Sequence, residues 1–167
     1  LNPKFKYNLS LIVENYYFNK EYKKSKKILK NFKKEEIFFY WYRVKKQAQI
    51  IEKQRNAAES INFIESEYNK ITNPNNKMLF DLANFYRNAK EFEKAINLYT
   101  KLLDKIDDNA FIHSDILYRR GSSYERIKDY KKADKDLLAS LELDPDDAYV
   151  LNYLAYSWLE RDFKIEE

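Results

Sequence analysis

A six-residue pattern occurs three times in this chain, and the residues around it align with it. The copies are KEYKKS, KEFEKA and KDYKKA, which begin at residues 20, 90 and 128. An aromatic residue stands one helical turn before each copy (Tyr16, Tyr86 and Tyr124), and apolar residues follow each copy at intervals of three and four. This spacing is typical of amphipathic helices. Each repeat is therefore predicted to be two helices joined by a short polar turn that contains the hexad.

Within the hexad, the third and sixth residues are predicted to carry the packing. The third is aromatic and the sixth is small, and the three pairs are Tyr22 and Ser25, Phe92 and Ala95, and Tyr130 and Ala133. We expect the aromatic ring to fold back on the first helix and the small residue to let the two helices approach closely. The lysines and acids between them are expected to face water.

The composition supports an almost entirely helical chain. There is one glycine and there are three prolines in 167 residues, whereas sheet proteins with many tight turns need glycine for positive φ angles. The hydrophobic content of 44% is ample for a core. The absence of cysteine excludes disulfides and thiolate metal sites, and the sequence contains no apolar run of about 18 residues that would span a membrane.

The repeating unit resembles the tetratricopeptide repeat, a helix–turn–helix unit of about 34 residues. The match is best in residues 114–147, whose signature places hold Leu117, Gly121, Tyr124, Tyr130, Ala133, Leu137, Ser140 and Pro145. Gly121 stands where the family's glycine lets paired helices touch, and the equivalent sites hold Val13, Ala83 and Ala155. The resemblance implies an all-α fold, a right-handed superhelical solenoid of antiparallel helix hairpins.

The resemblance covers nearly the whole of residues 1–167, as one array of about four and a half repeats. Repeats are predicted at about 6–37, 76–109 and 114–147, with a degenerate unit at 38–73 whose turn KQRNAAE lacks the aromatic, and a partial unit at 148–167. Both ends resemble cuts through a longer array, so the chain is expected to be a fragment of a longer protein. Because a missing neighbour leaves apolar surface bare in a solenoid, Leu151, Leu154 and Trp158 are predicted to be partly exposed, or covered by a trailing segment or a second copy.

Residues that could support catalysis are sparse. The only histidine, His113, is predicted to lie in an extended connection, and a chain with one glycine has no phosphate loop or dinucleotide fingerprint. The acids at 104–108 and 144–147 lack the central glycine and the terminal glutamate of a calcium loop. Asp146 or Asp147 is instead predicted to cap the next helix. We therefore predict no enzymatic activity, no metal and no cofactor.

The resemblance also implies a binding surface, because the first helices of tetratricopeptide arrays line a concave groove that holds an extended peptide or a partner helix. The candidates on these helices are Asn84, Arg87, Asn88, Tyr118, Arg119, Ser122, Arg126, Tyr149, Asn152, Tyr153 and Tyr156, together with Tyr7, Glu14, Tyr17 and Phe80. Asn can bond a peptide backbone, Tyr offers rigid contact area and Arg grips carboxylates. One subtype of the family clamps a C-terminal carboxylate, but Phe80 stands where that clamp has lysine. The predicted function is a non-catalytic scaffold for another protein.

A basic N-terminal segment provides the alternative. Residues 1–56 carry 15 Lys and Arg against 5 Asp and Glu, while the remainder carries 16 against 22. In the segment 20–34, the apolar residues Ile28, Leu29 and Phe32 mark the buried side, so the lysines, among them Lys23, Lys24, Lys26 and Lys27, are expected on the outer convex side. This face could contact nucleic acid or an anionic membrane, although no stacking array for bases accompanies it. A spacer between other domains is the third possibility.

The sequence does not assign a compartment. The stretch NYLAYSWLERDFKIEE is similar to helical arrays in proteobacterial, often envelope-associated proteins, which implies a bacterial protein. Both the cytoplasm and the periplasm or envelope stay open. Self-association through the C-terminal helix is a further expectation, since its apolar side would lack a neighbour.

Overall fold

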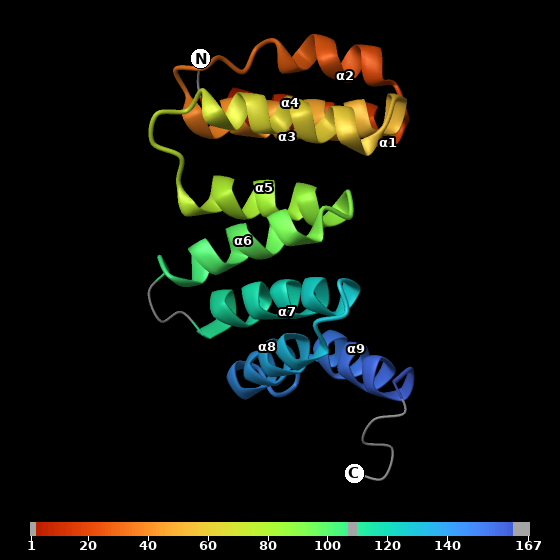
Figure 1. Ribbon diagram of the computed structural model, residues 1–167. Coiled ribbons are helices and arrows are strands. Elements are labelled where there is room, and N and C mark those ends of the chain that lie inside the picture. Colours follow the sequence, from red (N-terminus) through yellow and green to blue (C-terminus); the bar gives the residue numbers. More distant parts are fainter. Residues whose placement is uncertain (1–2, 107–109, 162–167) are drawn as a thin grey trace. The chain divides into compact units, whose positions relative to one another are not determined.

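The structure is a computed structural model of the chain, and it describes residues 3–106 and 110–161. The described residues form nine α-helices and no β-strand, which confirms the predicted all-α class (Figure 1). They divide into two compact units, Leu1–Asn73 and Pro74–Glu167.

Each unit is built from helices that pair with their neighbours along the chain. In the first unit α1 (Pro3–Phe18) packs on α2 (Tyr22–Leu29), and α3 (Ile37–Gln54) packs on α4 (Ala57–Asn69). In the second unit α5 (Asn76–Asn88) pairs with α6 (Phe92–Leu103), and α7 (Ala110–Arg126) pairs with α8 (Tyr130–Leu143). The last helix, α9 (Ala148–Leu159), packs against α8 and α7. The predicted helix hairpins are confirmed.

All four hairpins bury the same two positions, one on each helix, which stand twelve residues apart. The pairs are Val13 and Ser25, Ala48 and Ser60, Ala83 and Ala95, and Gly121 and Ala133, and all eight residues are buried. Both serines donate their hydroxyl to the backbone carbonyl of their pair, at 3.4 Å in the first hairpin and 2.8 Å in the second. The hairpin within residues 38–73 therefore keeps the register of the others, although Ala57 replaces the aromatic residue of its turn.

Gly121 shows why the contact demands small residues. A methyl group at this position would lie 3.0 Å from Asp136 Cβ, 3.0 Å from Leu137 Cγ and 3.2 Å from the Ala133 carbonyl. Helix α8 thus approaches closer than any side chain on Gly121 would allow without movement. The predicted close approach of the paired helices is confirmed here.

Each hexad begins on a residue in the left-handed conformation. Lys20, Lys90 and Lys128 have φ angles of 60°, 66° and 63°. The next residue donates its N–H to the carbonyl of the aromatic residue before the hexad, at 2.8 Å for Tyr16 and 2.9 Å for Tyr86 and Tyr124. With the accompanying bond from each lysine N–H to the carbonyl three residues earlier, this is a Schellman motif, which ends the first helix.

The second and fifth residues of each hexad also interact. Lys24 pairs with Glu21, Lys94 with Glu91 at 3.5 Å, and Lys132 with Asp129 at 2.7 Å. Each of these lysines places its Nζ 5.3 Å from the ring centroid of the preceding helix's aromatic residue. The expectation that the hexad charges only face water was incomplete. They are exposed, but they tie the start of the second helix to the end of the first.

Three other expectations are corrected by the structure. His113 lies in the first turn of α7 rather than in an extended connection, because that helix begins already at Ala110. Leu154 is buried, because Leu137 of α8 and Val150 pack against it. Ala155 is exposed, so it does not take the packing role of Gly121.

The other predictions for α9 agree with the structure. Leu151 is exposed and Trp158 is half-buried, with its Nε1 donating to Asp134 at 3.0 Å. Asp147 is the N-cap of the helix, where its carboxylate accepts from the backbone N–H groups of Tyr149 and Val150.

Candidate functional site

Several predicted groove residues of the second unit are linked by hydrogen bonds between α5, α7 and α9. Arg87 on α5 donates to Ser122 Oγ on α7 at 3.0 Å, and Arg119 on α7 donates to Asn84 Oδ1 on α5 at 3.2 Å. From α9, Tyr153 donates to the Ser122 carbonyl at 3.4 Å. We call this set, Asn84, Arg87, Arg119, Ser122 and Tyr153, the polar ladder. Helix α7 is its centre, and both neighbouring helices are held to it.

Arg119 is the most connected member of the polar ladder. Its Nε donates to Asp115 at 2.9 Å, and its guanidinium carbon lies 5.2 Å from the ring centroid of Phe80. Asn84, which accepts from Arg119, also accepts from the hydroxyl of Tyr99 at 2.7 Å. Burial raises the pKa of that phenol, so Tyr99 remains a neutral donor. Both groups that donate to Asn84 are therefore held in place.

Tyr153 joins α9 to α7 through its hydroxyl and its ring. The hydroxyl donates to Glu125 at 2.8 Å, and the ring meets Tyr118 edge to face with a centroid distance of 5.8 Å. The pKa of Tyr153 is raised, mainly by burial and to a smaller extent by the hydrogen bond to Glu125. Beside these residues lies a cavity of about 130 Å³, which is lined by Glu125, Arg126, Tyr153, Tyr156, Ser157 and Glu160.

The remaining candidates of the second unit leave their side chains exposed. Tyr149 and Tyr156 on α9 are 82% and 69% exposed, and Asn88, Arg126 and Asn152 are also at the surface. Arg126 lies 3.6 Å from Glu125 and is otherwise open to solvent. The sequence candidates thus divide into residues that hold the helices together and residues whose groups are available for contact.

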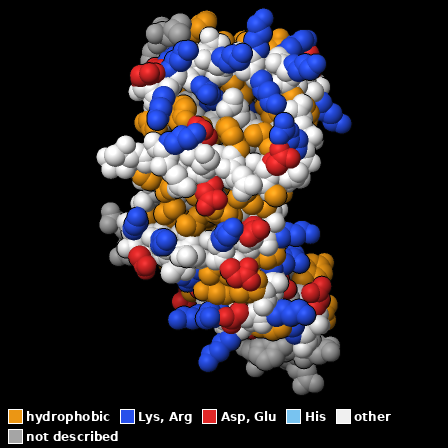
Figure 2. All heavy atoms as spheres, turned by 45° about the horizontal axis from the view of Figure 1, so that its top comes forward, with side chains coloured by type: hydrophobic (Ala, Val, Ile, Leu, Met, Phe, Trp, Pro, Cys, Tyr) orange, Lys and Arg blue, Asp and Glu red, His pale blue; other side chains and the backbone are white. Residues whose placement is uncertain are grey.

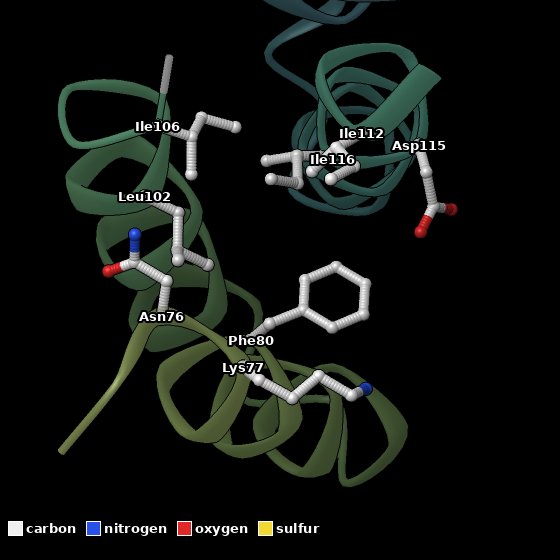
Figure 3. Close-up of a pocket in the computed structure, with 8 residues that line it drawn as sticks. All are labelled: Asn76, Lys77, Phe80, Leu102, Ile106, Ile112, Asp115 and Ile116. Atoms are coloured by element: carbon white, nitrogen blue, oxygen red, sulfur yellow. The ribbon is translucent and has the colours of Figure 1, made fainter. Parts of the chain in front are cut away.

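An apolar pocket lies next to the polar ladder, and sequence reasoning did not predict it (Figure 3). It has a volume of about 410 Å³ and lies between α5, α6 and α7. Its lining consists of Phe80, Leu102, Ile106, Ile112 and Ile116, with Asn76, Lys77 and Asp115 as the polar members. In Figure 3 the Phe80 ring lies between the Lys77 side chain and the isoleucines Ile112 and Ile116 of α7.

One sequence signal for this pocket was visible. The stretch DDNAFIHS adds residues between the repeats at 76–109 and 114–147; Ile106 directly precedes it and Ile112 lies within it. In the structure α7 has 17 residues where α5 has 13, so the added residues lengthen the start of α7, and Ile112 in this first part of the helix lines the pocket. The size of the pocket depends on side-chain packing, which the pattern does not contain.

The candidates of the first unit form a separate network. Glu14 on α1 accepts hydrogen bonds from Tyr42 and Lys46 on α3, each at 2.8 Å. The Nζ of Lys46 lies 4.2 Å from the ring centroid of Tyr17. Burial and the bond to Glu14 raise the pKa of Tyr42, so the phenol stays neutral. Glu14 and Tyr17 therefore join two helices, whereas Tyr7 is exposed.

The described residues offer little else for chemistry. Among residues 3–106 and 110–161, no three His, Cys, Asp or Glu side chains gather in a way that could hold a metal ion. In the same part of the chain, every helix is too short or too polar to cross a bilayer.

Comparisons with known proteins agree with this architecture. Residues 77–104 and 114–147 match the family model of the tetratricopeptide repeat. These two segments are similar to tetratricopeptide repeats. They fall in α5–α6 and α7–α8, the hairpins that carry most of the polar ladder and the apolar pocket.

A solved structure extends the likeness of the fold beyond these two repeats. The crystal structure of the APC/C hetero-tetramer Cut9–Hcn1 contains a similar chain, with a TM-score of 0.61 and 17% sequence identity. The similarity covers 89% of this chain but only 29% of the chain in that complex. A comparison with curated proteins finds no match. Tetratricopeptide-like repeats in an all-helical fold support a protein-interaction scaffold.

Proposed function

We propose that α5, α7 and α9 bind an extended peptide or a helix of another protein, and that one apolar side chain of this partner enters the pocket between α5, α6 and α7. Arg119 carries the proposal. Its guanidinium lies over Phe80, which lines the pocket, and it donates to Asn84 in the polar ladder. An apolar cavity and a polar surface therefore adjoin on the same two helices.

The pocket would supply affinity. A volume of about 410 Å³ accommodates a leucine, methionine or phenylalanine side chain. Burying one such side chain contributes about 1.5–3 kcal/mol. Phe80 contacts two cationic side chains, since the Nζ of Lys77 and the guanidinium carbon of Arg119 each lie 5.2 Å from its ring centroid. These contacts restrict the ring, so this wall of the pocket is already ordered before a partner binds.

The polar surface would supply orientation. Asn88 and Asn152 have amide groups that can bond a peptide backbone, and Arg126 can pair with a carboxylate. The polar ladder fixes the neighbouring side chains before a partner arrives, which avoids an ordering cost of about 0.5–1.5 kcal/mol per side chain. The exposed rings of Tyr149 and Tyr156 offer contact area on α9.

A peptide selection tests the proposal. Peptides would be selected from a random displayed library, and one labelled peptide would be measured by fluorescence anisotropy. We expect the selected peptides to share an apolar residue. Ile112→Trp, which fills the pocket from a partly exposed position, should weaken binding at least about ten-fold, as expected from the loss of one buried side chain. Arg126→Ala combined with Asn152→Ala should also weaken peptide binding, in addition to the effect of filling the pocket.

The matched control is Leu143→Trp, which adds the same bulk at an exposed apolar position of α8. It should leave binding unchanged. The proposed binding surface is wrong if no peptide is enriched, or if neither Ile112→Trp nor the double variant of Arg126 and Asn152 weakens binding. A spacer role then becomes the better interpretation.

Self-association through α9 is a second candidate, favoured by the exposure of Leu151 and Leu159 on this helix. Because Leu154 is part of the core, a charge there would unfold the helix rather than test a dimer. Leu151→Glu is the cleaner variant. Sedimentation velocity should show a dimer that this variant dissociates, and a monomeric wild-type chain would remove the candidate.

A further inference from the structure

The segment 20–34 of the first unit carries an uncompensated row of lysines. It contains eight lysines and one acid, Glu21. Lys24 is paired with Glu21 and Lys26 donates to Gln54 at 2.8 Å. The other six are exposed and form no ion pair with any residue the structure describes; they are Lys20, Lys23, Lys27, Lys30, Lys33 and Lys34. We call these six the lysine row.

The helix geometry places much of the lysine row on one side. Helix α2 buries Ser25 and Leu29. With 3.6 residues per turn, Lys23, Lys27 and Lys30 all fall on the opposite side, within about 10 Å along the axis. Figure 2 shows basic side chains spread over the top of the view, where Figure 1 places the first unit, with few acidic ones between them. This arrangement concentrates positive potential on one surface.

The acids close to the lysine row do not cancel it. Glu36 is paired with the buried Lys6, and Glu21 is paired with Lys24. Glu35 is exposed beside Lys34 and remains as one negative charge at the end of the row. Six positive charges therefore face one unpaired acid.

Exposed apolar side chains stand at both ends of the row. Phe18, two residues before Lys20, and Phe38, four residues after Lys34, are each 76% exposed, and Ile37 is also exposed. The Phe38 ring is linked to the core, because it meets the Phe39 ring edge to face and Phe39 stacks on the buried Phe32. Phe38 is therefore an exposed phenylalanine, oriented by its neighbouring ring, that can insert into an apolar phase.

We propose that the lysine row docks the first unit on a membrane surface rich in anionic lipid, with Phe38 inserted among the acyl chains. Lysine clusters bind anionic headgroups, and flanking aromatic or aliphatic side chains add apolar contact at the interface. Single-stranded nucleic acid offers phosphates as well, but its binding relies on aromatic rings along the basic track. Within the segment 20–34 the aromatic residues are half-buried Tyr22 and buried Phe32, so exposed rings occur only before and after this segment. That pattern favours a bilayer.

Vesicle flotation tests the proposal with the whole chain. The wild-type chain should float with phosphatidylcholine vesicles that contain phosphatidylserine and should not float with phosphatidylcholine alone. High salt should release it, because exposed charges are screened. Each lysine near an anionic leaflet changes affinity about five-fold. Replacing Lys23, Lys27, Lys30 and Lys34 with Gln should therefore weaken partitioning several hundred-fold.

The second unit offers a matched control. Lys101, Lys105, Lys131 and Lys135 are also exposed and form no ion pair within the described ranges. Their replacement with Gln removes the same charge from the chain, so a nonspecific charge effect would weaken both variants equally. The row-specific proposal requires that only the first variant detaches.

Phe38→Ser tests the apolar contact separately. Because this side chain is exposed, the substitution should not disturb folding, which circular dichroism checks. We expect about a ten-fold weaker partitioning that keeps its salt dependence. The proposal is overturned if the wild-type chain ignores phosphatidylserine, if the control variant detaches equally, if Phe38→Ser binds like the wild type, or if the same lysines bind an oligonucleotide more tightly than vesicles.

Discussion

The left-handed lysines of the three hexads give a prediction about stability with a definite sign. A left-handed conformation costs a residue with a Cβ atom about 1–2 kcal/mol, and Lys20, Lys90 and Lys128 all adopt it. Their side chains are exposed and make no hydrogen bond or ion pair with any described residue. Replacing each with glycine would relieve the strain and remove no contact.

The expected gain is the difference between two terms. Glycine relieves the left-handed strain, but it also gives the unfolded chain more freedom, which costs about 0.4–1 kcal/mol. The net stabilisation should be about 0.5–1 kcal/mol for each lysine. The three lysines lie in three different hairpins and share no partner, so their effects on the unfolding free energy should add to about 1.5–3 kcal/mol.

Urea unfolding followed by circular dichroism measures this change. The midpoint should rise while the slope with denaturant stays the same. Lys90→Ala is the control that removes the side chain but keeps Cβ, and it should leave the midpoint nearly unchanged. Lys135→Gly, in the exposed interior of α8, should lower stability by about 1 kcal/mol. If Lys90→Gly is no more stable than Lys90→Ala, the strain argument is refuted.

Three further predictions follow from particular contacts. Gly121→Ala should lower the unfolding free energy by about 1 kcal/mol in urea, because overpacking against Asp136, which Arg120 holds with two hydrogen bonds, exceeds the gain in helix propensity; a more stable variant would contradict this. Burial and the bond to Glu67 raise the pKa of Tyr40 to about 12. Since the pKa of an unfolded tyrosine is about 10, the folded state favours the neutral phenol, and the stability that this phenol contributes is lost as pH rises from about 10 through 12. The urea midpoint of Tyr40→Phe should therefore fall less over that pH range than the midpoint of the wild type. Asp147→Ala should lower the melting temperature through the loss of about 1 kcal/mol of capping at α9, whereas Asp146→Ala should have little effect.

The sequence predicted the packing of the hairpins because packing residues are visible in a pattern. Small residues at Ser25, Ala95 and Ala133 and the single glycine at Gly121 are chemically distinctive, and each lies where the helices touch. The left-handed turns were not predicted. Glycine or asparagine usually marks such a turn, whereas lysine has no preference for it, so the backbone conformation is set by the two hydrogen bonds that close the turn.

The candidate site was less accessible to sequence reasoning. Helical spacing identified residues on one side of α5, α7 and α9, but it did not separate Arg87 and Arg119, which join helices, from the exposed Arg126. The apolar pocket was missed because its lining residues, such as Ile116 and Leu102, have the same helical period as core residues. Leu154 was predicted to be partly exposed, or covered by a trailing segment or a second copy, because α8 was not expected to cover it.

In each hairpin the two buried packing positions stand twelve residues apart, and this fixed spacing limits where the length of such a chain can change during evolution. One residue inserted inside a hairpin would rotate the small residue of the second helix by about 100°, away from its pair. Links between hairpins carry no such restriction, and the step from Ala83 to Gly121 is longer than the two equal steps from Val13 to Ala48 and from Ala48 to Ala83. Homologues should gain and lose residues between α6 and α7, and an epitope tag or a protease site placed between these helices should leave both cores intact.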